Sequence, residues 1–423
     1  MSETVIIIIF AIYVLVSFII SVIDIAGASF YDIQMMKRLR DRQKHPHAGR
    51  YTKRPMVSII IPTFNEEKVI ERCLNSLTQS DYRKYEIIVA DDGSKDNTKK
   101  IVRKFIKGHK MTGKIKLVSD GQNRGRGGAI NQGFKKSKGE LIMAIDADCT
   151  VEPDSVRNAA LHFADDKVMA MAANVKIMPH LSILGLLQQF EYVTSFRSKK
   201  FNSFANAEYI VGGAGATYRR SILEKLGGFD ETKLTEDIDL SLRIALSGNK
   251  QNIMQYGSDV VVMTEHVPTY KSLFNQRFRW KLGSLQALYT SKQLFWSRNK
   301  EYSKTLTWFR LPMVLWGETM LLLEPLVLSF FVYLAIAQQT PIMFIVSWAA
   351  LMVTLFFAIW GDDMLSTAQK LRFTIFMPIM YLLYYILSFI QIIAMFKAIK
   401  NHRKIRGKIK IRGNWTSPER LAS

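Results

Sequence analysis

Four long apolar runs divide this chain of 423 residues. The first covers residues 5–23 and contains no Asp, Glu, Lys or Arg, so it is long enough to cross a hydrocarbon core of about 30 Å. The other three cover roughly 311–337, 341–360 and 373–396. We therefore predict a multi-pass membrane protein, with one anchor before a large polar region and about three spans after it.

The first run has the features of a retained anchor rather than those of a cleaved signal sequence. Its leading residues, MSET, carry no basic charge, and its apolar core is longer than that of most signal sequences. No small-x-small cleavage site is evident after it. We predict that residues 1–30 form a transmembrane anchor.

Basic segments flank the apolar runs and bear on orientation. Residues 37–54 and residues 397–412 each carry eight Lys and Arg. The positive-inside rule places the first segment, and the polar region after it, in the cytoplasm, and it asks the same of the second. One span before the polar region and three after it would put the second segment outside. Either one late segment is interfacial or re-entrant, or the rule fails here, and the sequence leaves this open.

From about residue 55 to residue 300 the pattern changes to short apolar runs that alternate with helical stretches. Runs of strand length cover residues 56–61, 86–90, 114–118 and 141–145. Helical patterns lie between them, at about 67–78, 97–107 and 127–137. This alternation predicts a parallel sheet with helices on both faces.

Polar clusters directly follow three of the predicted strands. The first strand runs into PTFNEE, the second into DDGSKDNT and the fourth into DADCT. In open α/β sheets, ligands bind in the crevice outside the carboxyl ends of the strands. The three clusters can therefore converge on one ligand, although about 80 residues separate the first from the last.

Two of these clusters contain paired aspartates. Asp146 and Asp148 can bind a divalent cation and leave positions for phosphate oxygens, although two solvated loop aspartates would look the same. Asp91 and Asp92 can accept hydrogen bonds from a base or ribose, although turns and helix caps use the same residue types. Both alternatives stay open for each pair.

Two further stretches carry candidate residues. NRGRGGAINQG, residues 123–133, opens a helical pattern and offers Arg124 or Arg126 to phosphate charge, with a flexible loop as the alternative. Its spacing matches neither a P-loop nor a dinucleotide fingerprint. Thr235, Glu236 and Asp237 begin another helical pattern. They either cap it, or they place a carboxylate as a general base.

The stretch QRFRW, residues 276–280, precedes the later apolar runs. On a helix, Gln276, Arg279 and Trp280 share one face, because they lie at i, i+3 and i+4. A membrane-surface helix explains the interleaved basic and apolar residues, and we assign Arg277 and Phe278 to that explanation. It does not explain the shared face, where an indole can stack on a sugar while arginine and glutamine hold a diphosphate.

Composition narrows the classes of partner. The formal net charge of +22 points to nucleic acid, anionic lipid or a phosphate-bearing ligand. The apolar runs weigh against nucleic acid. The two cysteines, Cys73 and Cys149, have no metal-binding spacing and indicate neither a disulfide nor a zinc framework.

Taken in order, PTFNEE, DDGS, NRGRGGAINQG, DAD, GGAGATYRR, TED and QRFRW resemble the motifs of membrane-integrated family 2 glycosyltransferases. This group includes cellulose, chitin, hyaluronan and poly-N-acetylglucosamine synthases. The resemblance covers about residues 55–285 and implies an α/β GT-A domain joined to transmembrane helices. The implied organisation is an anchor (1–30), a basic linker (31–54), a cytoplasmic GT-A domain (55–270), amphipathic interfacial helices (271–300), about three transmembrane helices (305–398) and a basic tail (399–423).

The resemblance also implies roles for individual residues. Asp237 would be the catalytic base, and Asp148 together with Asp146 would hold Mg²⁺ or Mn²⁺. Relatives usually carry lysine where this chain has Arg126, which stays cationic with a different geometry. The residues implied in substrate binding are Thr63, Glu66, Asp91, Asp92, Arg126, Asp146, Glu236, Gln276, Arg279 and Trp280.

The implied function is inverting transfer of a hexose or N-acetylhexosamine from a nucleotide sugar, with UDP-GlcNAc as first choice. The acceptor would be a growing polysaccharide at the cytoplasmic face of the plasma membrane, with or without export. One alternative is a single transfer onto a polyprenyl phosphate or another lipid, and a second is an inactive membrane protein that binds sugar. Membrane lipids are expected partners and nucleic acid is not.

The membrane part is short for a closed polymer channel, which leaves room for a second copy of the chain or an export partner. Glu318 and Glu324 lie within an apolar run. Carboxylates in such runs are usually buried and functional. A sugar path and a role in helix packing or at the membrane interface both remain open for these two residues.

Overall fold

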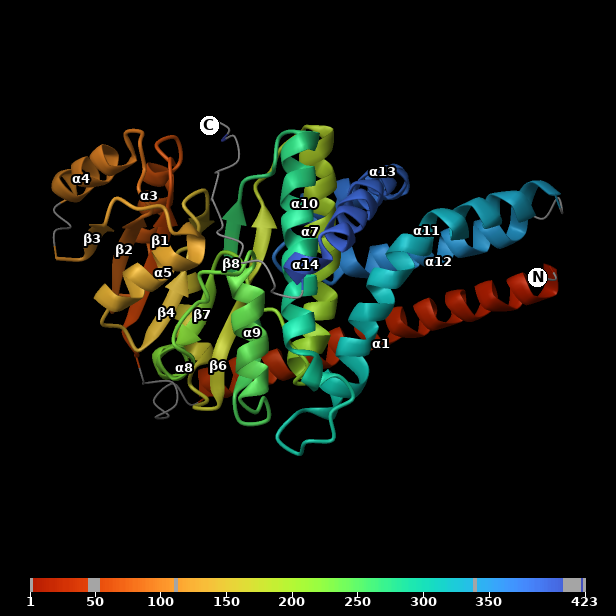
Figure 1. Ribbon diagram of the computed structural model, residues 1–423, viewed down its shortest axis with the longest axis horizontal. Coiled ribbons are helices and arrows are strands. Elements are labelled where there is room, and N and C mark those ends of the chain that lie inside the picture. Colours follow the sequence, from red (N-terminus) through yellow and green to blue (C-terminus); the bar gives the residue numbers. More distant parts are fainter. Residues whose placement is uncertain (1–2, 45–53, 110–112, 338–340, 406–419, 421–423) are drawn as a thin grey trace.

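The computed structural model describes residues 3–44, 54–109, 113–337, 341–405 and 420 (Figure 1). Within this part, eight strands form one sheet in the order β3-β2-β1-β4-β7-β6-β8-β5. The strands are β1 (Val57–Thr63), β2 (Tyr85–Asp91), β3 (Ile115–Ser119), β4 (Leu141–Ala144), β5 (Thr150–Val151), β6 (Val168–Ile177), β7 (Ala216–Arg219) and β8 (Ile253–Thr264).

The four predicted strands are confirmed and pair in parallel, β1 with both β2 and β4, and β2 with β3. Beyond β4 the prediction of a parallel sheet holds only for the pair β6 and β8. There, β7 runs antiparallel to both β4 and β6, and β5 runs antiparallel to β8. The sheet is therefore mixed.

Alternating side chains of β1 supply both faces of the sheet. Val57, Ile59 and Ile61 belong to the core that includes α3 (Ile70–Thr78), while Ile60 belongs to the core on the other face. The other helices of the polar region are α4 (Thr98–Gly108), α5 (Gly125–Lys136), α6 (Ser155–His162), α8 (Arg220–Leu226) and α9 (Glu236–Leu246).

Helix α5 lies very close to β1. A Cβ atom placed on Gly133 would come within 2.6 Å of Ile60 Cγ2. This close approach fixes the start of α5, where the predicted phosphate-binding stretch lies, relative to the ends of the parallel strands.

Two long helices, α7 (Ile183–Phe204) and α10 (Tyr270–Thr290), lie side by side between the sheet and the apolar helices (Figure 1). Beyond them, α1 (Glu3–Lys44), α11 (Leu311–Ala337) and α12 (Pro341–Trp360) extend away from the sheet, whereas α13 (Thr367–Lys400) stays beside α7 and α10. The short helix α14 (His402–Ile405), a 3₁₀ turn (Lys292–Leu294) and a π-helical turn (Thr305–Arg310) complete the described helices.

By length and composition, three helical segments of the described part could cross a membrane: Leu15–Asp41, Thr305–Ala337 and Leu383–Lys400. Helix α1 continues well past the predicted anchor, to Lys44, so residues 31–44 of the basic linker are helical. Residues 45–53 of that linker, and residues 406–419 of the basic tail, lie outside the described residues.

Candidate functional site

We describe the site as two parts. The strand side consists of five carboxylates that lie at or after the ends of β1, β2 and β4: Glu66, Asp91, Asp92, Asp146 and Asp148. The helix side consists of Glu236 and Asp237 at the start of α9, with Gln276, Arg279 and Trp280 on α10.

Asp91, the last residue of β2, is fully buried and tied down by hydroxyl and backbone donors. Its carboxylate accepts hydrogen bonds from the Ser119 hydroxyl (2.7 Å) and the Ser94 backbone N–H (3.3 Å). Lys99 Nζ lies 3.7 Å from the same carboxylate. These contacts fix the turn after β2.

Asp92 joins this turn to the glycine-rich stretch. Its carboxylate accepts hydrogen bonds from the backbone N–H groups of Arg124 (2.7 Å) and Gly125 (2.9 Å). Burial raises the pKa of Asp92 to about 6, the nearby Asp120 and Asp91 also raise it, and the two backbone hydrogen bonds act in the opposite direction. The DDGS motif therefore positions the loop that leads into α5.

Asp148 and Glu66 share one cation in the structure. The Arg420 guanidinium donates to Glu66 Oε2 (2.7 Å) and Oε1 (2.5 Å) and to Asp148 Oδ2 (2.5 Å). Burial lowers the pKa of Arg420, but Asp148 and Glu66 outweigh burial, so the pKa is raised overall. A positive group is thus stabilised between the ends of β1 and β4.

Arg126 links the two sides of the site. Its guanidinium donates to Asp146 on the strand side (2.7 Å) and to Glu236 on the helix side (2.6 Å). Burial opposes the charge, but Asp146, Glu236 and Asp237 outweigh it and raise the pKa of Arg126. Asp146 and Glu236, which are 90 positions apart in the sequence, are thereby brought together.

Asp237 is held by backbone donors at the start of α9. Its carboxylate accepts hydrogen bonds from the Gly213 N–H (2.9 Å) and the Ile238 N–H (2.8 Å). A Cβ atom on Gly212 would lie 2.6 Å from Asp237 Oδ2, so glycine is needed for this close approach. The GGAGA stretch therefore orients Asp237, a link that the sequence pattern alone did not reveal.

The predicted polar face of α10 carries two groups without internal partners. Gln276 Oε1 is buried with no hydrogen-bond partner among the described residues. Arg279 makes no hydrogen bond or ion pair there either. Burial lowers the pKa of Arg279, and the nearby Glu236 and Asp237 raise it, which places this guanidinium beside the start of α9. Neither group is committed to another side chain of the described part.

The assignment of Arg277 to a membrane-surface helix is wrong. This residue is 4 % exposed and donates to Glu191 of α7 at 2.5 Å. Its guanidinium also lies 4.2 Å from the centroid of the Trp280 ring. Arg277 therefore joins α10 to α7 through Glu191, and its guanidinium packs against the ring of Trp280. Phe278 lies under Lys397 of α13, 4.7 Å from ring centroid to Nζ.

Two threonines behave differently from the expectation. Thr63 is fully buried and its hydroxyl donates to Ile61 O (3.0 Å), so the structure commits this side chain to its own strand. Thr235 stands at the N-cap of α9 but makes no side-chain capping bond. It packs instead on Gly283 of α10, where an added Cβ would lie 2.4 Å from Thr235 Oγ1. Packing between helices has displaced the usual cap.

Several residues near the site were not predicted. Arg72 of α3 donates to Glu265 (2.6 Å) and to the Asp148 backbone carbonyl (3.4 Å). Glu265 directly follows β8, so the same polar-cluster-after-strand signal that marked DADCT could have found it. Neither Arg420 nor Glu191 carried a local signal, because each acts on a residue far along the chain.

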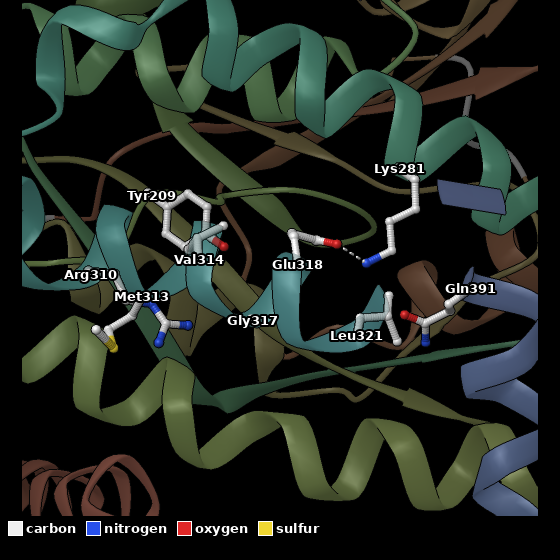
Figure 2. A pocket seen from close by; sticks show the side chains of 9 residues that line it. All are labelled: Tyr209, Lys281, Arg310, Met313, Val314, Gly317, Glu318, Leu321 and Gln391. Carbon is white, nitrogen blue, oxygen red and sulfur yellow. Dashed lines mark hydrogen bonds and ion pairs between the residues drawn. The ribbon is translucent and has the colours of Figure 1, made fainter. Parts of the chain in front are cut away.

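Glu318 belongs to α11 and lies next to α10. Its carboxylate pairs with Lys281 at 2.6 Å (Figure 2). Both side chains line a pocket of about 320 Å³ between α10, α11 and α13. The other lining residues are Tyr209, Arg310, Met313, Val314, Gly317, Leu321 and Gln391.

The chain has the GT-A fold with a mixed sheet, and it carries helices long and apolar enough to span a membrane. Residues 58–227 match the family model described as "Glycosyl transferase family 2".

The curated relatives include two synthases from staphylococci. The poly-β-1,6-N-acetyl-D-glucosamine synthase of Staphylococcus epidermidis is 30% identical over 246 residues, which cover 58% of this chain and 57% of that protein. The synthase of the same name from Staphylococcus aureus strain COL is 30% identical over 234 residues, 55% of each chain. The chain thus spans little more than half the length of these relatives.

A solved structure shares the overall fold. A mannosyltransferase from Pyrobaculum calidifontis, in complex with GDP-mannose and Mn²⁺, matches 92% of this chain and 99% of its own. The TM-score is 0.54 and the sequence identity is 22%. At this level of sequence identity, the likeness shows a shared fold only.

Proposed function

We propose that this chain is an inverting, metal-dependent glycosyltransferase that adds N-acetylglucosamine from UDP-GlcNAc to a growing polysaccharide. The observation that carries the proposal is Arg126, which draws the DAD and TED motifs together. Asp146 and Glu236 contact its two sides, so a diphosphate at the strand ends would lie beside the start of α9. The names of the staphylococcal relatives support the sugar and the polymer.

The donor would lie along the strand side. Asp91 and Asp92 hold the turn after β2 in place. This turn would present its backbone groups and hydroxyls to the nucleoside. Arg126 and Arg279 carry the positive charge that stabilises a departing nucleoside diphosphate. The unpartnered Gln276 Oε1 and the Trp280 ring supply a hydrogen-bond acceptor and a stacking surface for the acceptor sugar.

A divalent cation fits the chemistry of the strand side. Among the described residues, no group of three or more His, Cys, Asp and Glu side chains is gathered closely enough to bind a metal alone. Asp148 and Glu66 nevertheless hold the Arg420 guanidinium between them, so this position stabilises a cation. Asp148 and Asp146 would hold Mg²⁺ or Mn²⁺ together with diphosphate oxygens, which suits the incomplete protein coordination that such ions accept. When bound, the ion offsets the negative charge on the leaving diphosphate.

Asp237 would act as the general base. Its two backbone hydrogen bonds leave the carboxylate oriented, and the start of α9 favours a negative charge there. Asp237 takes the proton from an acceptor hydroxyl while the acceptor oxygen bonds to the anomeric carbon. The bond from that carbon to the diphosphate oxygen breaks as UDP leaves, and the configuration inverts without a covalent enzyme intermediate.

The location follows from the apolar helices and the basic linker. We place the catalytic domain at the cytoplasmic face of the plasma membrane, with the chain anchored by several spans. The eight Lys and Arg of residues 37–54 support this orientation.

The experiment uses the full chain in lipid nanodiscs with Mn²⁺. UDP-GlcNAc, UDP-glucose and GDP-mannose are supplied in turn, and nucleoside diphosphate release and product size are measured. We expect release with UDP-GlcNAc and a ladder of products that resists lipid extraction. One short glycolipid would overturn the polymer in favour of single transfer to a lipid. Absence of release with every donor would overturn the enzyme.

A further inference from the structure

Helix α3 holds the backbone of the DAD motif from one side. Arg72 and Cys73 are neighbours on this helix, and each contacts a different carbonyl oxygen of the motif. Arg72 Nη2 donates to the Asp148 carbonyl (3.4 Å), and Cys73 Sγ donates weakly to the Asp146 carbonyl (3.8 Å). The backbone of both aspartates is therefore supported by α3.

The same helix fixes the position of Glu66. The backbone N–H of Ile70, the first residue of α3, donates to the Glu66 carbonyl (3.0 Å). Further along the helix, the Ser76 hydroxyl accepts a hydrogen bond from the backbone N–H of Val151 in β5 (3.2 Å). Glu66 and Asp148, which hold one cation between them, are thus positioned by a single helix.

The end of β8 supports the DAD motif from the other side. Glu265, which follows β8, accepts a hydrogen bond from Arg72 Nη2 (2.6 Å), the same nitrogen that contacts the Asp148 carbonyl. Strand β5, just after the motif, pairs with β8, where Val151 lies opposite Val262. The Arg72–Glu265 ion pair therefore joins α3 to the end of β8 directly beside the backbone of Asp148.

The Asp148 carboxylate also has a partner in the next residue. The buried Cys149 thiol lies 3.2 Å from Asp148 Oδ1, while Asp148 Oδ2 contacts the Arg420 guanidinium. Because a thiol is a weak hydrogen-bond donor, it adds little restraint of its own. The backbone position that Arg72 supports is therefore the main determinant of where this carboxylate lies.

We infer that Arg72 and Glu265 are positioning residues for the divalent cation, and that they set its affinity by holding Asp148 at a fixed place relative to Glu66. The inference rests on the proposed function, because the cation belongs to that proposal. Both residues act through Asp148. Hydrogen-bonded partners of metal ligands change metal affinity by about 10–100-fold. The lower end applies here, because Arg72 contacts the backbone of Asp148 rather than its carboxylate.

A charge effect alone predicts the opposite sign. Removing Arg72 by itself would leave the Glu265 carboxylate without its arginine and add negative charge beside Asp148, which would attract a divalent cation more strongly. The double variant, Arg72→Met together with Glu265→Gln, removes one positive and one negative charge, so the net charge near the motif stays the same. Its Mn²⁺ affinity therefore reports the position of Asp148.

Mn²⁺ binding to the full chain in nanodiscs, without donor, tests the inference. Electron paramagnetic resonance of free Mn²⁺ gives the dissociation constant. We expect the double variant to bind Mn²⁺ about ten-fold more weakly than the wild type. The matched control is Glu71→Gln, at an exposed residue of the same helix, which should leave the dissociation constant unchanged. Equal or tighter binding by the double variant would overturn the inference.

Arg72→Gln is a milder second variant that keeps the test decisive where the double variant does not fold. Its altered charge favours tighter binding, so weaker binding than in the wild type can only come from the lost support of Asp148. Equal or tighter binding by Arg72→Gln would then contradict the inference. Arg72→Lys, which restores a cation beside Glu265, should recover part of the affinity.

The Mn²⁺ dependence of sugar transfer separates positioning from a structural role. In the double variant, the Mn²⁺ concentration for half-maximal turnover should rise about ten-fold, while turnover at saturating Mn²⁺ stays near that of the wild type. A loss of turnover that saturating Mn²⁺ does not restore would show a structural role and overturn the inference. A wild-type chain that binds Mn²⁺ but transfers no sugar would overturn the proposed function alone, and one that binds no Mn²⁺ would overturn both.

Discussion

The strand side and the helix side of the site are held in different ways. On the strand side, backbone N–H groups and hydroxyls from neighbouring loops hold Asp91 and Asp92. On the helix side, a buried ion pair between Arg277 and Glu191 joins α10 to α7 and supports Trp280. The first side depends on local turns at strand ends, and the second depends on packing between helices that are distant in sequence. Four variants test this difference.

The largest expected effect is at Asp237, where the two sides meet. We expect Asp237→Asn to reduce turnover by about 10²–10⁴-fold or more, because an amide cannot accept the acceptor proton. Donor affinity should stay near that of the wild type, since the strand side is untouched. Sugar transfer and donor binding are measured separately. The matched control is Asp239→Asn in the same helix, which removes a 2.8 Å contact to Arg243 and should leave turnover per folded molecule unchanged. Near-normal transfer by Asp237→Asn would assign the base elsewhere.

Arg277→Met should have the next largest effect, on stability. Removing one partner of a buried ion pair leaves a buried charge unpaired and costs about 3–5 kcal/mol. Thermal unfolding in nanodiscs gives the measurement, with Arg157→Ala as control. The Arg157–Asp81 pair is about 40 % exposed on each side, so its loss should cost about 1 kcal/mol or less. Replacing both Arg277 and Glu191 by apolar residues should recover much of the loss. Equal melting temperatures for Arg277→Met and Arg157→Ala would show that the helix side does not depend on this pair.

A smaller effect is expected at Arg420, on the strand side. Because its guanidinium contacts Glu66 and Asp148, it should compete with a divalent cation for the same oxygens. If that contact contributes about 1 kcal/mol, Arg420→Ala should tighten Mn²⁺ binding about five-fold. Electron paramagnetic resonance of free Mn²⁺ without donor measures this, and Arg420→Lys should stay closer to the wild type. An unchanged dissociation constant would show that the ion binds elsewhere.

The smallest expected effect is a pH dependence from Asp92. Its pKa is raised to about 6 in the folded chain, above the ordinary value near 4. Between these values the folded state binds more protons than the unfolded state, so this group makes stability fall as pH rises from about 4 to 6. The melting temperature of the wild type relative to Asp92→Asn should therefore decrease over that range and level off above it. A difference that is independent of pH would show that Asp92 does not titrate there.

Much of the strand side could be predicted, because its information is local. Short β-branched runs of strand length marked β1, β2, β3 and β4, and the polar residues after them fell at one edge of the sheet. The strands beyond β4 escaped detection. β7 has four residues, and its antiparallel partners lie far away in the sequence, so no run of usual strand length revealed it.

The helix side was predictable only in part. The i, i+3, i+4 spacing grouped Gln276, Arg279 and Trp280, but it could not show that Arg277 would be buried against Glu191, which lies 86 residues earlier. Thr235 had the sequence of an N-cap, yet contact with Gly283 prevailed over the capping bond. In both cases a distant helix decides the role of a residue, and no local pattern encodes that helix.

Lys200 sets a limit on how this protein can be divided for study. Its side chain is 2 % exposed and donates to Asp32 of α1 at 2.5 Å, with Asp363 of the loop before α13 close by. Expressing the polar region alone, without its membrane helices, would strip Lys200 of both partners and Lys176 of Asp362. The ammonium groups of Lys200 and Lys176 would then lack the carboxylates that pair with them in the full chain. The catalytic part is therefore a poor candidate for a soluble fragment, and purification in lipid with every helix attached is the sound route to its chemistry.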